Sequence, residues 1–140
     1  MPVVTNSNSR IVDYFYNAQK LVVYKEGEIQ ALTKGDDKFE LVINGLLEIT
    51  ENSHEMPAFG VSLDHETREA LKTGIWIELE FVGVQEYNGM PFESLLIQVN
   101  NNHSGFNLIR RYNGKYEGRC FYLHLENDMQ QLYNDIMQLS

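Results

Sequence analysis

The chain has 140 residues, of which 43% are hydrophobic and 22% are charged, and its 20 acidic and 11 basic side chains give a net charge of −9 at pH 7. This composition fits one globular domain and is too apolar for a wholly disordered chain, while no apolar run reaches the roughly 20 residues that span a bilayer. One cysteine excludes an internal disulfide framework, and the acidic balance argues against nucleic-acid binding, which uses a basic surface.

The N-terminal residues carry no targeting pattern. Residues 1–9 are small and polar, and neither a basic segment nor a continuous apolar segment follows them. Because a secretory signal needs both features, we expect none, and the single cysteine then favours the reducing cytoplasm. We interpret residues 1–9 as a flexible tail and residues 10–140 as a single domain, since no linker or repeat interrupts them.

The first predicted elements are a short helix and a hairpin. Residues 11–19 place apolar side chains at helical spacing, and we favour a helix although their aromatic content also suits a strand. Glu26 and Gly27 separate two apolar stretches and predict a hairpin with a tight turn. In that hairpin Tyr24 is expected to pair with Ile29.

Residues 36–51 show the clearest helical pattern in the chain. Either Asp36 or Thr33 is expected to accept the free N–H groups at the start of this helix. Gly45, inside the helix, predicts close packing on a sheet, because glycine is otherwise unfavourable there. The apolar stripe consists of Phe39, Val42, Ile43, Leu46, Leu47 and Thr50.

A strand, a helix and a second strand are expected next. Residues 58–63 favour a short strand, and Asp64 is the expected N-cap of a helix over residues 65–73 that ends at Gly74. Residues 75–82 alternate between apolar and mixed positions, which is typical of a strand with one face on the core. The opposite face, expected to lie toward water, carries Trp76, Glu78, Glu80 and Val82.

Two Asn-Gly pairs predict hairpin turns in the second half of the chain. A two-residue loop at Asn88-Gly89 would place the apolar residues of its two strands on opposite faces. We therefore expect a loop of odd length, or a bulge near Gly83 or Pro91. The turn at Asn113-Gly114 needs no such correction, and its predicted pairs are Arg110 with Glu117, Leu108 with Arg119 and Phe106 with Phe121.

A C-terminal helix over residues 127–139, capped by Asn127, completes the pattern. Strands outnumber helices and most are joined by hairpins. The sequence therefore predicts an α+β fold: one domain with a largely antiparallel sheet, made of the first hairpin and a C-terminal meander, with helices packed on one face.

The common catalytic and metal-binding patterns are absent from the sequence. His54 and His65 each precede a glutamate, but their spacing matches no zinc motif, so we expect neither a metal site nor a cofactor. Cys120 has no second cysteine near it and is interpreted as a small apolar residue in a strand. The paired acids Glu78 and Glu80 are able to do acid–base chemistry in a cleft, but we expect them to face water.

The most informative segment is cationic and aromatic. Residues 26–93 hold fifteen acids and four bases, a net charge of −11, whereas residues 105–125 hold one acid and four bases, a net charge of +3. Arg119 alternates with apolar residues on the expected core face, and a buried arginine needs a carboxylate or a ligand. The candidate residues for binding a ligand or partner are Arg110, Arg111, Tyr112, Lys115, Tyr116, Glu117 and Arg119.

These features favour a non-enzymatic interaction or regulatory domain that binds another protein, or a second copy of itself, through the cationic hairpin. The alternative is a protein or enzyme that binds a small anion in a cleft. That cleft would be lined by Arg119, Arg110 and Glu117, or by Glu78 and Glu80. A third interpretation, an inhibitor that mimics the charge of nucleic acid, rests on the net charge alone and predicts one contiguous acidic face.

Overall fold

The computed structural model describes residues 10–56 and 60–139, so the predicted tail 1–9 and the start of the predicted strand 58–63 lie outside the described residues. In chain order the elements are η2 (Ile11–Asn17), β1 (Lys20–Lys25), β2 (Glu28–Thr33), α1 (Asp37–Ile49), β3 (His54–Met56), β4 (Val61–Ser62), α2 (Asp64–Ala70), β5 (Ile75–Tyr87), β6 (Met90–Gln98), β7 (Gly105–Arg111), β8 (Gly118–Arg119), β9 (Phe121–His124) and α3 (Gln130–Met137). No helix in this part of the chain has the length and apolar character needed to cross a membrane.

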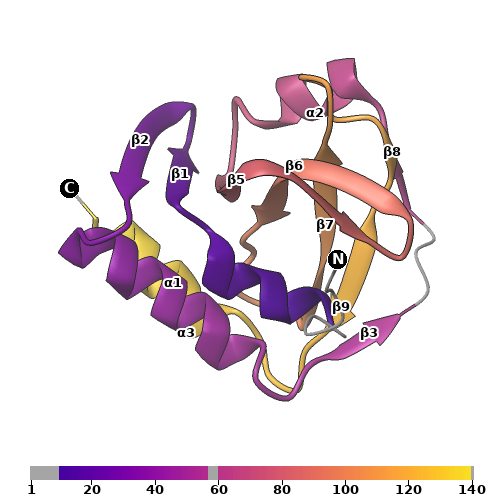
Figure 1. The fold of residues 1–140 in the computed structure, drawn as a ribbon. Coiled ribbons are helices and arrows are strands. Elements are labelled where there is room, and N and C mark those ends of the chain that lie inside the picture. The colour runs from indigo at the N-terminus through magenta and orange to yellow at the C-terminus, as the bar shows by residue number, and fades with distance from the viewer. Residues whose placement is uncertain (1–9, 57–59, 140) are drawn as a thin grey trace.

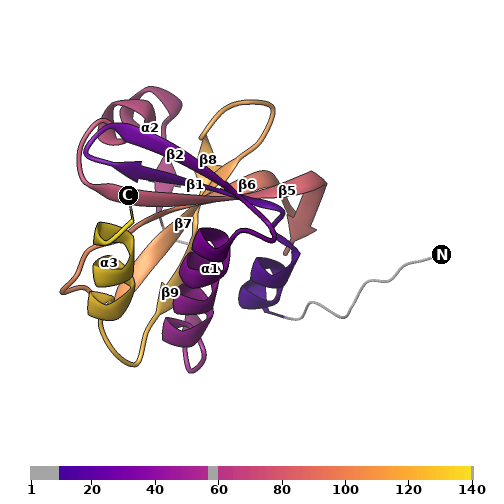
Figure 2. The same ribbon diagram turned by 90° about the vertical axis from the view of Figure 1, so that its left-hand side faces the viewer.

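The strands form one large sheet and one small ladder. The seven-stranded sheet has the order β2-β1-β5-β6-β7-β9-β3 with antiparallel neighbours, and β4 and β8 pair separately (Figure 1). Figure 2 shows η2, α1 and α3 on one side of the strands and α2 on the other. The predicted α+β fold is confirmed, and α2 is the described helix that lies outside the main helical layer.

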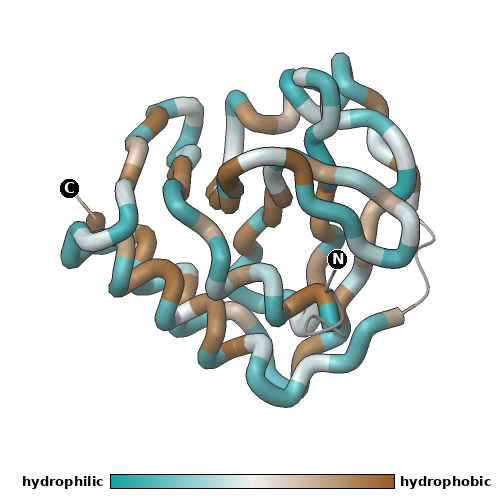
Figure 3. The backbone as a smooth tube through the Cα atoms, in the orientation of Figure 1, coloured by the Kyte–Doolittle hydropathy of each residue, from teal (hydrophilic) through white to brown (hydrophobic). Residues whose placement is uncertain are grey.

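The main core lies between the sheet and the three helices η2, α1 and α3. In Figure 3 apolar residues recur along α1, α3 and β5, which help to enclose it. A Cβ atom added to Gly45 would lie 3.2 Å from both Leu132 Cδ1 and Asp135 Oδ2. The close packing predicted for Gly45 is therefore against α3, and the prediction of a sheet contact is wrong. Fully buried side chains of this core include Ile11, Phe15, Leu21, Leu46, Ile77, Leu79, Phe92, Leu95, Ile97, Leu108 and Leu123.

A second, smaller core covers the other face of the sheet. Trp76, Leu96 and Tyr116 are buried there, with Leu71 at the end of α2 packed against them. The expectation that this face of β5 lies in water is therefore wrong for Trp76 and Glu78, both of which are buried. The covering layer comes from α2, which directly precedes β5 in the chain, and from the segment that follows β7, which is distant from β5 in sequence.

Two of the three predicted hairpins form as expected. Tyr24 pairs with Ile29 across the β1–β2 turn. The β5–β6 hairpin turns at Asn88-Gly89, and its register shifts between Glu80 and Gln85 around Gly83, which has φ +77°. The predicted bulge near Gly83 is confirmed, and it keeps the apolar residues of both strands on the main core.

The third hairpin turns where predicted but follows a different register. Asn113 and Gly114 have φ values of +54° and +76°, and Tyr112 pairs with Lys115 across them. Beyond this bridge the predicted register is wrong, because Leu108 rather than Phe106 pairs with Phe121. Residues 116–120 leave the ladder, and within them β8 pairs with β4 instead.

The helix boundaries differ from the predictions in ways that matter for the site. Asp64 is the first residue of α2 rather than its N-cap, and its carboxylate accepts hydrogen bonds from Tyr116 and Arg68 instead. The Asp36 carboxylate accepts from the N–H and hydroxyl of Thr33, so it closes the β2–α1 turn. The C-terminal helix is shorter than predicted, because it begins at Gln130 and Asn127 does not cap it.

Candidate functional site

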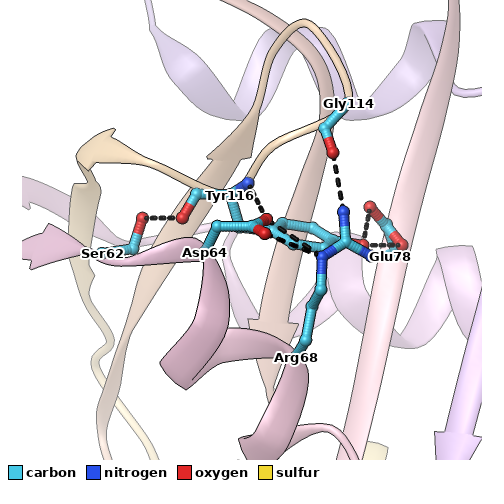
Figure 4. A network of polar contacts seen from close by, with 6 residues as sticks. All are labelled: Ser62, Asp64, Arg68, Glu78, Gly114 and Tyr116. Atoms are coloured by element: carbon cyan, nitrogen blue, oxygen red, sulfur yellow. Dashed lines mark hydrogen bonds and ion pairs between the residues drawn. The ribbon is translucent and has the colours of Figure 1, made fainter.

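Glu78 is the centre of a buried polar network on the second core. Its side chain lies in the middle of β5 and is 0% exposed. The hydroxyl of Tyr24 donates to Oε1 at 2.9 Å, and that of Ser94 donates to Oε2 at 2.5 Å. The Tyr116 hydroxyl lies 2.9 Å from both oxygens (Figure 4). A buried carboxylate is tolerated only with such partners, and here hydroxyl groups from three separate segments supply them.

The two tyrosines act as hydrogen-bond donors over a wide pH range. Burial, followed by the nearby charge of Glu78, raises the pKa of Tyr24 to about 12. The same two causes raise the pKa of Tyr116 well above its ordinary value. Both hydroxyl groups are therefore protonated at neutral pH and able to donate to the Glu78 side chain.

Arg111 supplies the opposite charge but forms no hydrogen bond with this carboxylate. Its Nη1 lies 3.8 Å from Oε2 of Glu78, whose oxygens already accept from hydroxyl groups. The Arg111 Nε is buried and has no hydrogen-bond acceptor among the described residues. The side chain as a whole is 37% exposed. Arg111 is therefore a half-buried cation that is placed close to Glu78 but is not fully hydrogen-bonded within the described residues.

Tyr116 anchors the segment that covers this network, which we call the cationic turn (residues 110–119). Its backbone N–H donates to Asp64 Oδ1 at 2.8 Å, and its carbonyl accepts from the hydroxyl of Ser62 at 2.9 Å. Its ring lies under the Arg68 guanidinium, 5.2 Å from the centroid, and its hydroxyl reaches Glu78 (Figure 4). Contacts on all sides therefore fix one residue of an otherwise exposed turn.

Arg68 holds the tip of the cationic turn. Its Nε donates to the Asp64 carboxylate at 3.0 Å, and its Nη2 donates to the carbonyl of Gly114 at 2.7 Å (Figure 4). The Tyr116 N–H, and after it Arg68, lower the pKa of Asp64. Asp64 therefore remains ionised at neutral pH. It links α2 to Tyr116 directly and to Gly114, at the tip of the turn, through Arg68.

Arg110 and Arg119 do not occupy the positions that the sequence suggested. Arg110 donates from Nη1 to the carbonyl of Pro91 at 2.8 Å and from Nε to the carbonyl of Arg119 at 2.7 Å. The predicted ion pair with Glu117 is therefore replaced by bonds to backbone. The Arg119 side chain is exposed on β8, so the prediction that it lies on the core face is wrong. The cause is the departure of residues 116–120 from the main ladder.

The predicted site residues therefore fall into three groups. Arg110 and Tyr116 are structural, and Arg111 lies between the buried network and the surface. Four side chains remain exposed and close in sequence: Tyr112, Lys115, Glu117 and Arg119. The two predicted acids do not form a shared cleft, because Glu78 is fully buried and Glu80 is partly exposed.

Five residues that build the site were not predicted from the sequence. Tyr24 and Ser94 donate hydrogen bonds to Glu78, whereas the residues that hold Tyr116 and the turn are Ser62, Asp64 and Arg68. The pairing of Val22 and Leu96 with Glu78 on either side of β5 brings Tyr24 and Ser94 near Glu78. Alternation within β5 alone gives no sign of that pairing. The spacing of Asp64 and Arg68 at i and i+4 was a usable signal for a local ion pair.

A depression of about 320 Å³ adjoins the anchored tyrosine. Tyr24, Ile29, Leu71 and Tyr116 give it an apolar surface, and Arg68 and Lys72 contribute cations. Lys72 is paired with Glu69 at 2.9 Å, and Arg68 is paired with Asp64. The depression therefore extends the surface of the cationic turn toward the β1–β2 hairpin.

The described residues contain no group of three His, Cys, Asp or Glu side chains that is able to hold a metal ion. Cys120 is buried with a free thiol, and burial raises its pKa. A raised pKa keeps the thiol protonated and lowers its reactivity, which agrees with the apolar role expected for it.

Comparison with known proteins assigns no function to this arrangement. No protein-family model matches the chain, and neither the curated proteins nor the solved structures compared with it give a match. Function is therefore argued from the contacts, burial and charge of these residues.

Proposed function

We propose that this protein is a non-enzymatic binding module that docks the acidic surface of another protein on its cationic turn. The observation that carries the proposal is the anchoring of Tyr116 between Asp64, Ser62 and Glu78, which fixes the turn while Lys115 and Arg119 face outward. A surface that is ordered before binding loses less conformational entropy when a partner docks.

The charge distribution supports a partner rich in carboxylates. Residues 105–125 carry a net charge of +3, while residues 26–93 carry −11. Cations on an acidic protein attract a carboxylate-rich surface locally, while the acidic remainder of the protein repels acidic surfaces that do not meet the turn. Arginine and tyrosine are also the side chains that most often contribute large binding energies at protein interfaces.

The buried network has a supporting role rather than a catalytic one in this proposal. The Glu78 oxygens accept hydrogen bonds from three hydroxyl groups, and no part of the side chain is exposed. A general base must reach the proton that it abstracts, and Glu78 does not reach the surface. The small-anion alternative draws its support from Arg111, whose side chain is 37% exposed and whose buried Nε has no acceptor among the described residues.

The test is a titration with poly-L-glutamate, a defined acidic polypeptide, followed by calorimetry. We expect Lys115→Glu and Arg119→Glu each to weaken binding by about tenfold, because each removes a charge that attracts the acidic polypeptide and adds one that repels it. Lys34→Glu is the matched control, because it makes the same charge change at another exposed site. Equal effects of the three substitutions would show that net charge, and not the cationic turn, controls binding.

A titration and a light-scattering measurement separate the related hypotheses. Saturable binding of inorganic phosphate that is lost in Arg111→Lys, without binding of poly-L-glutamate, would favour the small-anion alternative. Light scattering of the protein alone at low and high salt tests association of the turn with an acidic face of a second copy. Such association is expected to weaken as salt screens the charges.

A further inference from the structure

Strand β2 forms one end of the seven-stranded sheet, and the direction of its backbone groups follows from its hydrogen bonds. The Lys34 N–H donates to the carbonyl of Gln19, so the backbone N–H and C=O groups of Lys34 point toward β1. The direction of these backbone groups alternates along a strand, so they also point toward β1 at Glu28, Gln30 and Leu32. The N–H and C=O groups of Ile29, Ala31 and Thr33 therefore point away from the sheet.

Only part of this edge is closed within the chain. Asp36 bonds both backbone groups of Thr33: its carboxylate accepts from the Thr33 N–H, and its own N–H donates to the Thr33 carbonyl. The outward groups of Ile29 and Ala31 have no backbone partner in the described part of the chain. Four backbone groups, two donors and two acceptors, are thus left open on one short stretch.

Two features that usually protect an edge strand, a proline and a bulge, are missing from β2, whose single charged residue is Glu28 at its start. The Ile29 side chain of this strand is 68% exposed. Natural edge strands are commonly protected by proline, by a bulge or by inward-pointing charges, because open backbone groups pair readily with another strand. An edge with open backbone groups, no proline, no bulge and an exposed isoleucine is able to accept another strand.

We propose that two copies of this chain pair through β2, antiparallel about a twofold axis, with Ile29 opposite the partner's Ala31. In this register the open groups of Ile29 and Ala31 on each copy form four backbone hydrogen bonds, so no open group of either residue is left over. The two seven-stranded sheets would then form one continuous sheet across the interface.

The side chains favour a second copy over an unrelated strand. The symmetric register places Gln30 opposite the partner's Gln30, and it brings the exposed Ile29 against the partner's Ala31. Glu28 falls opposite the partner's Leu32, so no like charges of the two strands face each other. The strand is therefore complementary to itself in backbone groups, apolar contact and charge, as a twofold interface requires.

This interface does not depend on the proposed binding function, and its open backbone groups lie outside the cationic turn. Ile29 also lines the depression beside Tyr116, so Ala31→Pro is the substitution that acts on the edge alone. Backbone hydrogen bonds and apolar contact are only weakly affected by salt, whereas docking on the cationic turn is salt-dependent. The two proposals are therefore tested independently. Salt and Lys115→Glu are expected to change binding at the cationic turn, whereas Ala31→Pro is expected to change dimer formation at the β2 edge.

The first experiment measures molar mass by light scattering across a wide protein concentration range. We expect a dimer that persists in high salt, and Ile29→Lys should shift it to monomer. Val82→Lys is the matched control, because Val82 is an exposed valine (78%) on the bulged part of β5. Ala31→Pro removes only an outward donor and should also give monomer while circular dichroism shows that the fold is kept.

A second experiment tests the register itself. Gln30→Cys places cysteines opposite each other in a non-hydrogen-bonded antiparallel pair, where the Cα separation of about 4.5 Å suits a disulfide. We expect oxidised glutathione to cross-link this variant rapidly and Ala70→Cys, an exposed site on α2, slowly. A wild-type monomer at all concentrations, or a dimer that Lys115→Glu and salt dissolve while Ile29→Lys does not, would overturn the proposal.

Discussion

The Tyr116 hydroxyl lies 2.9 Å from both carboxylate oxygens of Glu78, and this contact ties an exposed turn to the fully buried centre of β5. The same tyrosine is bonded through its backbone to Asp64 and to Ser62. Tyr116 therefore contributes both to the stability of the second core and to the order of the cationic turn, and the two are expected to change together when its side chain is altered.

Tyr116→Phe removes the hydroxyl and keeps the ring in the second core. Glu78 then loses a hydrogen bond from a buried donor, and we expect the free energy of unfolding to fall by about 1–3 kcal/mol. Urea denaturation measures this change. Tyr112→Phe is the control, because the Tyr112 side chain is exposed, and a similar loss in both variants would argue against a special role for the Tyr116 hydroxyl.

Glu78→Gln tests the charge of the network at nearly constant shape. The substitution replaces an acceptor oxygen by an NH₂ group and leaves Arg111, half-buried, without its counter-charge. We expect a loss of roughly 3 kcal/mol, since the carboxylate accepts several hydrogen bonds and neutralises a cation. Glu80→Gln on the same strand is partly exposed and should cost less than about 0.5 kcal/mol. If the two variants unfold alike, the network does not stabilise the fold.

The raised tyrosine pKa values predict a loss of stability in alkali. Tyr24 ionises near its ordinary value of 10.0 when unfolded and at about 12 when folded, so its contribution is complete below pH 10 and disappears as the pH rises toward 12. Tyr116 adds to the change in the same direction. Unfolding measured at a series of alkaline pH values should show a steeper decline for the wild type than for Tyr24→Phe. Parallel curves would contradict the prediction.

Asp64→Ala is expected to loosen the cationic turn without removing any of its residues. The change removes the acceptor of the Tyr116 N–H and of the Arg68 guanidinium. Arg68, which bonds the carbonyl of Gly114 at the tip of the turn, is then no longer held in place. Amide hydrogen exchange at Tyr116 should accelerate, and binding of poly-L-glutamate should weaken although a negative charge has been removed. Glu69→Ala removes the other bonded acid of α2 and serves as the control, because its partner is Lys72.

Local patterns predicted the parts of the fold that local chemistry determines. Glu26-Gly27 predicted the first hairpin. The mismatch of apolar faces around Asn88-Gly89 predicted either a loop of odd length or a bulge near Gly83 or Pro91, and the bulge near Gly83 is the one that forms. The helix over residues 36–51 was also predicted within two residues of its ends. Each of these features depends on turn chemistry or periodicity within one short segment.

The buried network could not be predicted in the same way. Glu78 becomes buried because Tyr24, Ser94 and Tyr116 reach it from three other segments. The alternation of residues 75–82 distinguishes two faces of a strand but does not reveal that a second layer covers the polar one. Arg119 was misplaced for a related reason, since alternation was extended through residues 116–120, where the chain leaves the ladder to pair with β4.

The bulge between Glu80 and Gln85 has a consequence for which changes in chain length this fold tolerates. The ladder near the turn and the ladder near Leu79 differ in register by an odd number of residues, and side chains alternate with a period of two. Deleting one residue from 81–84 would reverse that parity and turn either Phe92 or Leu95 out of the core, whereas a deletion of two would preserve it. Natural variation in length at this bulge should therefore come in pairs of residues.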